Sequence, residues 1–240
     1  MRVLAIGAHP DDIELGCGGA LLRHAAAGDH ITILVVTRGE RGVADDRSRF
    51  AAQRRAARVL GADLRWGTFV DGEVTFGPGL VQAIDEVLES CGADIVYTHA
   101  VEDSHQDHCA ISRASLAASR RLSSVLFYES ESTQRFHPTV FIDVSGLIEA
   151  KLALAQSPRS QDDRSGAVEL DALVAQARFR GSQARTGYAE GFEVGRFLWQ
   201  PGPVVPDASA TEADTESGPK FDRAAVTPLR SVRSRLEILK

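Results

Sequence analysis

Cysteine, methionine and aromatic residues are scarce in this sequence, and long apolar runs are missing. Its 240 residues include three cysteines, one methionine and 6% aromatic side chains. Three cysteines without a CxxC pair do not support a disulfide framework and favour a reducing compartment. No apolar run approaches the roughly 18 residues of a membrane span, and the first residues, MRVLAIGAHP, predict a buried strand rather than a signal peptide. We therefore expect a cytoplasmic protein without a membrane span.

The sequence also lacks an excess of positive charge. Its 27 Lys and Arg against 33 Asp and Glu give a net charge of −6, which argues against nucleic-acid or anionic-membrane partners. The apolar share of 43% and the charged share of 25% are ordinary for a globular chain. Collagen, coiled coil and bulk disorder are thereby excluded.

What the sequence does contain is a regular alternation of strand and helix patterns. Short apolar runs predict strands at 2–8, 31–37, 64–70, 94–98, 124–128, 139–144 and 193–198. Amphipathic patterns predict helices at 18–27, 48–60, 79–90, 108–119, 146–156 and 167–180. This order is typical of an α/β fold, a Rossmann-like three-layer sandwich with a mostly parallel sheet.

The composition changes near residue 200. We expect one α/β domain over residues 1–200, a flexible Pro-, Ser-, Thr- and acid-rich linker over 201–220, and a short basic helix or tail over 221–240. In an α/β domain, ligands bind beyond the carboxyl ends of the strands. Polar residues that directly follow a strand are therefore the candidates for function.

The first candidate cluster follows the first predicted strand. His9, Asp11, Asp12 and Glu14 place one imidazole and three carboxylates within six residues, which is costly unless a positive charge neutralises them. A divalent metal would do so, with one carboxylate as ligand and its neighbour as a base. The alternative is that Asp11 and Asp12 cap a helix and favour its dipole. Glu14 is interpreted either as structural or as a residue that supports the metal ligands.

The second cluster follows the strand predicted at 94–98. His105 and His108 are three residues apart and share a face of a helical turn, with Asp107 between them. Imidazole and carboxylate ligands suit zinc, or ferrous iron, and the two clusters together offer enough ligands for one ion. His99 is interpreted as a polar loop residue.

These clusters resemble the two motifs of a known family. A-H-P-D-D-x-E after a first strand and H-x-D-H about a hundred residues later are similar to the zinc-dependent N-deacetylases of the LmbE-like or PIG-L family. Further similarities are the turn Thr37–Gly42, Arg49 ahead of Leu60-Gly61, and Val70-Asp71-Gly72. One departure is Ala52, where the family usually has an acidic residue.

The resemblance implies roles for the clustered residues. The zinc ligands would be His9, Asp12 and His108. Asp11 would be the general base, and His105 would stabilise the oxyanion or protonate the leaving amine. Asp107 would orient one of the imidazoles.

Three residues are candidates for contact with the substrate. By resemblance, Arg49 and Asp71 would bind sugar hydroxyls. Arg38 lies in a strand-end turn and is a candidate for contact with an anionic part of the substrate, with a solvated surface role as the alternative.

The clusters predict a metal site, and the resemblance implies a zinc enzyme that removes the acetyl group from a small N-acetylglucosamine-type amino sugar, with zinc-bound water attacking the amide. A metal-dependent phosphoesterase using the same cluster and a non-catalytic Rossmann-like binding module are the alternatives. The sequence leaves open the particular substrate, the ion used in the cell, the role of the tail and the oligomeric state, a homo-oligomer included. It also leaves open the roles of Glu14, His99, Tyr188 and Glu190.

Overall fold

The computed structural model describes residues 1–41, 46–155 and 170–199. The linker expected at 201–220 and the tail expected at 221–240 lie outside the described residues. Within the described part of the chain, no helix is long and apolar enough to cross a membrane.

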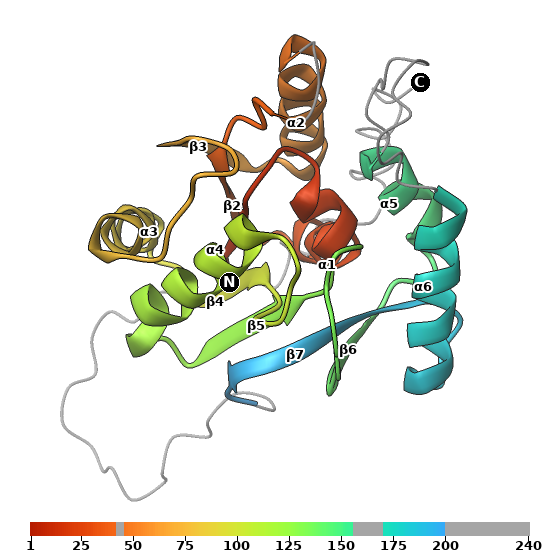
Figure 1. Cartoon of the computed structure of the whole chain (residues 1–240). Coiled ribbons are helices and arrows are strands. Elements are labelled where there is room, and N and C mark those ends of the chain that lie inside the picture. Colours follow the sequence, from red (N-terminus) through yellow and green to blue (C-terminus); the bar gives the residue numbers. More distant parts are fainter. Residues whose placement is uncertain (42–45, 156–169, 200–240) are drawn as a thin grey trace, which may run out of the picture.

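A single mixed sheet of seven strands forms the centre of the molecule (Figure 1), in the order β3-β2-β1-β4-β5-β7-β6. The strands β1 to β5 run parallel, and β7 runs antiparallel to its neighbours β5 and β6. The expected α/β sandwich with a mostly parallel sheet is thereby confirmed. The strands are β1 Arg2–Gly7, β2 His30–Thr37, β3 Asp63–Phe69, β4 Ile95–His99, β5 Ser124–Tyr128, β6 Val140–Asp143 and β7 Ala189–Phe197.

Helices cover both faces of this sheet, as Figure 1 shows. They are α1 Asp12–Ala27, α2 Asp46–Leu60, α3 Pro78–Cys91, α4 Gln106–Ala118, α5 Ile148–Ala155 and α6 Leu170–Ala184, with a short 3-10 turn at Ser119–Arg121. Successive side chains of a strand point to opposite faces, so β1 contributes to two cores. Val3 and Ala5 pack with residues of α1, α2 and α5, whereas Leu4 and Ile6 pack with residues of α3 and α4.

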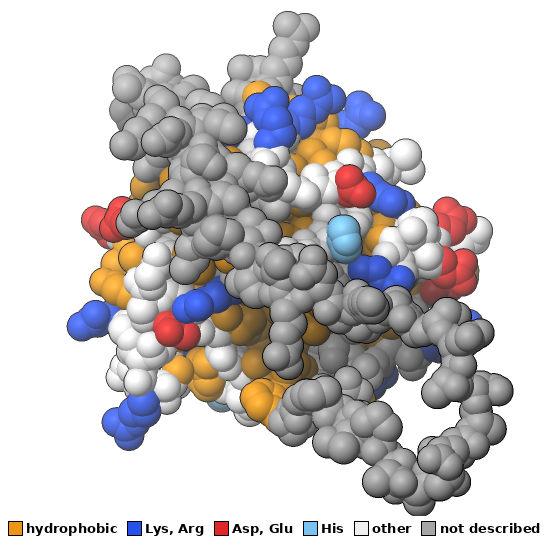
Figure 2. Space-filling view, turned by 180° about the vertical axis from the view of Figure 1, so that it is seen from behind, with side chains coloured by type: hydrophobic (Ala, Val, Ile, Leu, Met, Phe, Trp, Pro, Cys, Tyr) orange, Lys and Arg blue, Asp and Glu red, His pale blue; other side chains and the backbone are white. Residues whose placement is uncertain are grey.

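The strand order sets the position of the site. From β1 the chain crosses to β2 and β3 on one side, and then returns to β4 on the other side of β1. The carboxyl ends of β1 and β4 therefore flank the point where the winding direction reverses, which is where open α/β sheets bind ligands. Figure 2 shows the opposite face of the molecule, where basic and acidic side chains are interspersed on the visible described surface.

Helix α1 is interrupted one turn after its start. Cys17 has φ −137° and ψ 18°, and this non-helical residue separates a first turn from the longer segment that the sequence predicts at 18–27. The Lys151 Nζ donates to the Leu15 carbonyl at 2.7 Å, and the Glu190 carboxylate accepts from the N–H groups of Gly19 and Ala20, each at 2.7 Å.

Lys151 and Glu190, which bond to the backbone at this break, also form an ion pair with each other. Lys151 Nζ lies 2.5 Å from Glu190 Oε1, and both side chains are buried. A helix break inside the protein leaves backbone groups that need partners, and this ion pair supplies them. The role of Glu190, which the sequence leaves open, is therefore to cap the second segment of α1.

Candidate active site

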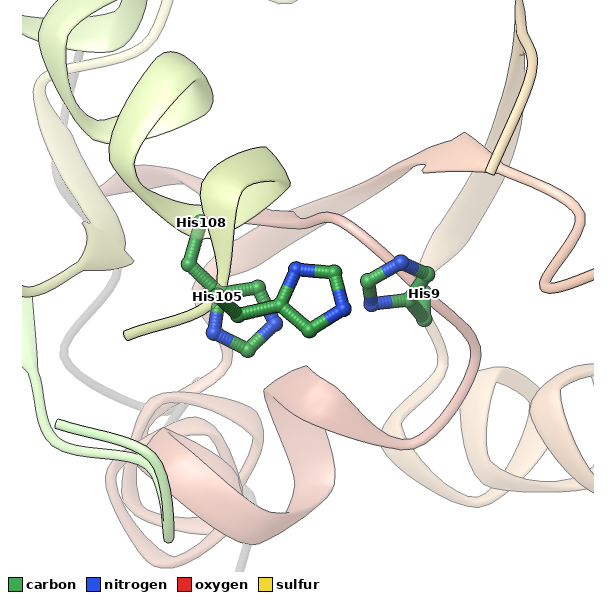
Figure 3. Close-up of side chains that lie close together, drawn as sticks. All are labelled: His9, His105 and His108. Atoms are coloured by element: carbon green, nitrogen blue, oxygen red, sulfur yellow. The ribbon is translucent and has the colours of Figure 1, made fainter. Parts of the chain in front are cut away.

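The two polar clusters of the sequence meet at the carboxyl ends of β1 and β4. Figure 3 shows the rings of His105 and His108 extending from the start of α4 toward His9, which lies in the loop after β1. The ring centroids of His9 and His105 are 4.7 Å apart, and those of His105 and His108 are 4.5 Å apart. Because β1 and β4 are hydrogen-bonded neighbours, residues about one hundred positions apart come into contact.

One carboxylate oxygen, Asp12 Oδ2, lies close to His9, His99 and His108. It accepts the His9 backbone N–H at 2.7 Å, and it lies 3.4 Å from His9 Nδ1 and 3.6 Å from His108 Nε2. Burial opposes ionisation of this carboxyl group. The neighbouring imidazoles of His108 and His99 outweigh burial and hold the pKa of Asp12 well below its usual value.

His9 is oriented by two other carboxylates. Its Nε2 lies 3.0 Å from Asp71 Oδ1 and 3.3 Å from Asp107 Oδ2, so its Nδ1 faces Asp12. Burial opposes the charged form of His9, but Asp107 and Asp12 raise its pKa to about 10. Three carboxylates around one imidazole leave the site short of positive charge, which is the condition that favours a bound cation.

His108 presents a buried nitrogen without a hydrogen bond. Its Nδ1 lies 3.2 Å from Asp103 Oδ2 and 3.3 Å from Ser132 Oγ. Its Nε2 has no hydrogen-bond partner among the described residues and points toward Asp12. Buried polar atoms are almost always hydrogen-bonded. An unpaired imidazole nitrogen at this position is therefore consistent with a metal ligand.

The donor atoms fit a transition metal. Three groups of described residues have ligand atoms within 4.8 Å of one another, and they are His9, His105 and His108; Asp12, His99 and His108; and His9, Asp71 and Asp107. The groups overlap through His9 and His108, so they describe one region. The nitrogen and oxygen donors present are those that zinc and ferrous iron accept.

Asp11 has an unusual backbone conformation beside this cluster. Its φ of 89° lies in the left-handed region, and its side chain does not cap α1, so the capping alternative is wrong for this residue. Gln53 Oε1 accepts the Asp11 N–H at 3.1 Å, and Arg49 Nη2 donates to the Pro10 carbonyl at 3.0 Å. Contacts to Gln53 and Arg49 therefore hold the turn that presents Asp11.

Glu14 belongs to the same support of the Asp11 turn. It is buried, and it accepts from Gln53 Nε2 at 2.6 Å. Burial raises the pKa of Glu14 to about 8. Gln53 thus bridges Asp11 and Glu14, and a shallow hollow next to them includes Ala52 in its lining.

His105 directly precedes α4, at the edge of the site. Its Nδ1 accepts the Asp107 N–H at 3.2 Å and caps the helix, so in the neutral ring the proton resides on Nε2. Burial, followed by the charges of His108 and His9, lowers the pKa of His105. A lowered pKa favours the neutral ring, in which Nε2–H is the donor.

The residues predicted to contact the substrate have different surroundings. Asp71 is buried, with one oxygen on His9 and the other accepting the Arg41 N–H at 2.9 Å. Arg49 contacts the backbone of the Asp11 turn and lies 3.5 Å from Asp11 Oδ1. Arg38 is exposed, with its guanidinium 5.8 Å from the centre of the Phe50 ring. Substrate contact by these three residues stays a prediction.

Three further residues belong to the site and were not predicted from the sequence: His99, Asp103 and Gln53. His99 is the last residue of β4 rather than a loop residue, and it is fully buried. Its ring is stacked on His108 at 3.9 Å, and its Nε2 accepts the Ala8 N–H at 3.0 Å. Burial, followed by the charge of His108, lowers the pKa of His99 to about 4. The position of His99 directly after the apolar run of this strand was the available signal.

Comparisons with known proteins identify the family. Residues 4–119 match the PIG-L family, described as GlcNAc-PI de-N-acetylase. The uncharacterized deacetylase YaiS of Escherichia coli K12 is 37% identical over 150 residues, which are 59% of this chain and 81% of YaiS. The diacetylchitobiose deacetylase of Thermococcus kodakarensis is 25% identical over 186 residues, or 67% of this chain and 70% of that protein.

A solved structure supports the same assignment. The conserved protein TT1542 from Thermus thermophilus is 30% identical, with a TM-score of 0.75 over 85% of this chain and 100% of TT1542. The chain therefore belongs to the PIG-L family of deacetylases, as its motifs predict.

The fold by itself does not define the reaction. The 4-carboxy-2-hydroxymuconate hydratase GalB of Pseudomonas putida KT2440 has a TM-score of 0.70 at 20% identity, over 85% of this chain and 100% of GalB. Function must therefore be argued from the side chains of the site.

Proposed function

We propose that this protein is a metal-dependent N-deacetylase, which hydrolyses the acetamido group of an N-acetylglucosamine-type conjugate to an amine and acetate. The observation that carries the proposal is the buried, unpartnered Nε2 of His108, which faces Asp12 Oδ2 together with His9 Nδ1. His9, Asp12 and His108 would hold the ion, for which we propose zinc. When bound, zinc supplies Lewis acidity that polarises an amide carbonyl and lowers the pKa of water towards about 7.

Asp11 is the proposed general base. It follows the loop of His9 and precedes Asp12, and its turn is held by Gln53 and Arg49. Its carboxylate would accept a proton as water attacks the amide carbonyl carbon. The same proton can then be passed to the nitrogen as the carbon–nitrogen bond breaks, so that the amine leaves neutral.

His105 is proposed to act on the oxygen of the amide. Its Nδ1 is occupied by the Asp107 N–H, so its Nε2–H is the group available for donation. A donor at this position would stabilise the negative charge that develops on the carbonyl oxygen. The lowered pKa of His105 favours the neutral ring, whose Nε2–H can donate.

The substrate class follows from the family and a relative. The family description names a GlcNAc conjugate, and the Thermococcus relative is a diacetylchitobiose deacetylase. The net charge of −6 disfavours electrostatic capture of a polyanion. We therefore propose a small and mostly neutral N-acetylated amino sugar.

A metal analysis combined with an amine-release screen tests this function. We expect about one zinc ion per chain, and equal amounts of free amine and acetate from one or more of N-acetylglucosamine, diacetylchitobiose and related N-acetylglucosaminides. A chelator should abolish release, and zinc should restore it. A content near two ions per chain with phosphate release from phosphoesters would instead indicate a phosphoesterase. Absence of amine release from every N-acetyl compound would contradict the proposal.

A further inference from the structure

We propose that Asp103 is a positioning residue of the metal site, which holds both histidines of the His-x-Asp-His motif in place. The inference rests on the proposed metal ligands but not on the identity of the substrate. The resemblance assigns an orienting role to Asp107, and nothing in the sequence pattern assigns one to Asp103.

The two carboxylate oxygens of Asp103 serve two different histidines. Asp103 Oδ2 lies 3.2 Å from His108 Nδ1, and Asp103 Oδ1 accepts the His105 backbone N–H at 2.8 Å. The Asp103 side chain is 0% exposed. One buried carboxylate therefore fixes the ring of a proposed metal ligand and the backbone of the proposed oxyanion donor.

Asp103 is itself held by the loop that follows β5. Its Oδ2 accepts from Ser130 Oγ at 2.9 Å and from Thr133 Oγ1 at 3.0 Å. An isolated β-bridge joins Asp103 to Thr133, and the Ser104 N–H donates to the Ser132 carbonyl at 3.1 Å. The loops after β4 and β5 both fix the position of the Asp103 carboxylate. The carboxylate can therefore orient the His108 imidazole.

Asp103 and Asp107 contact different histidines. Asp107 Oδ2 accepts the Gly72 N–H at 2.7 Å and faces His9 Nε2 at 3.3 Å, whereas Asp103 faces His108 Nδ1. Each histidine proposed as a ligand thus has a carboxylate on the nitrogen that points away from Asp12. Such a contact fixes the tautomer, keeps a lone pair on the inner nitrogen and makes that nitrogen a better ligand.

The zinc affinity of Asp103→Asn tests this role. We expect the variant to bind zinc about 10- to 100-fold more weakly than the wild type in competition with a chelator. Asp94→Asn is the matched control, because Asp94 directly precedes β4 at the end away from the site and pairs with Arg2. The control should bind zinc as the wild type does. Equal zinc affinity in a folded Asp103→Asn variant would overturn the proposal.

A second measurement needs no variant. Nitrogen-15 NMR of histidine-labelled, zinc-loaded wild-type protein should show His108 with its proton on Nδ1 and zinc on Nε2. The opposite tautomer would overturn the proposal, as would a wild-type protein without measurable zinc affinity. Neither readout uses an acetylated substrate. A negative amine-release screen would therefore count against the deacetylase and leave the role of Asp103 standing.

Discussion

Asp11 is held in a left-handed backbone conformation that costs a non-glycine residue about 1–2 kcal/mol. The hydrogen bonds that offset this cost come from side chains of α2, which are Gln53 on the Asp11 N–H and Arg49 on the Pro10 carbonyl. Backbone strain of this kind concentrates at functional sites, where the surrounding structure enforces it. The conformation sets the direction in which the proposed base points.

Removal of the Gln53 contact should therefore impair turnover without removing the metal. We expect Gln53→Leu to lower kcat about 10- to 100-fold, because a base displaced by about 1 Å loses its alignment. The zinc content should remain that of the wild type. Gln82→Leu is the control, since Gln82 is exposed and contacts Glu86 on the surface of α3. An unchanged kcat in Gln53→Leu would show that this contact does not position Asp11.

At the scale of elements, the start of α1 packs against β5 at Gly16 and Tyr128. A β-carbon on Gly16 would lie 2.1 Å from the Tyr128 ring, which is fully buried and donates to the Ile6 carbonyl at 2.8 Å. Gly16 therefore allows the first turn of α1, with Asp12 in it, to pack directly on the strand beside β4.

Gly16→Ala should destabilise the fold for this reason. We expect a loss of about 1–3 kcal/mol in the free energy of unfolding, from overpacking against a ring that cannot move away. Gly79→Ala is the matched control, because a β-carbon there meets nothing within 4 Å in the first turn of α3. Urea unfolding should show little change or a gain for Gly79→Ala. Equal stability of the two variants would contradict the packing argument.

The elements themselves were largely predictable. Continuous apolar runs such as Ile31–Val36 alternate with amphipathic helix patterns, and this alternation predicts a parallel sheet. In a parallel sheet the residues that follow β1 and β4 lie at the same edge, so they come together. The break in α1 was not predictable, because the Glu190 carboxylate that accepts from the Gly19 N–H lies 171 residues away. Asp103 was missed for a related reason, since its partners Ser130 and Thr133 come from the loop after another strand.

At the scale of the whole molecule, one buried carboxyl group links stability to pH. Burial raises the pKa of Glu14 to about 8 in the folded protein, from 4.5 as its ordinary value. The folded state therefore binds a proton that the unfolded state releases. Stability from this group is fully present below about pH 4.5 and is lost as the pH rises towards 8.

Glu14→Gln should remove this part of the pH dependence. Glutamine stays neutral and retains an oxygen that can accept from Gln53 Nε2. Urea unfolding of both proteins between about pH 5 and about pH 9 should show a shallower decline for the variant, which gains relative stability at the alkaline end. Parallel curves over this range would show that Glu14 is ionised in the folded protein.

The central claim is that Asp11 and Asp12, adjacent in the sequence, divide the work of base and metal ligand. Zinc content and amine release measured on the same preparations of Asp11→Asn and Asp12→Asn test it most directly. We expect Asp11→Asn to keep about one zinc ion per chain and to lose at least about 100-fold in amine release, whereas Asp12→Asn should lose the zinc. Full activity of Asp11→Asn, or loss of zinc from it equal to that of Asp12→Asn, would contradict the account.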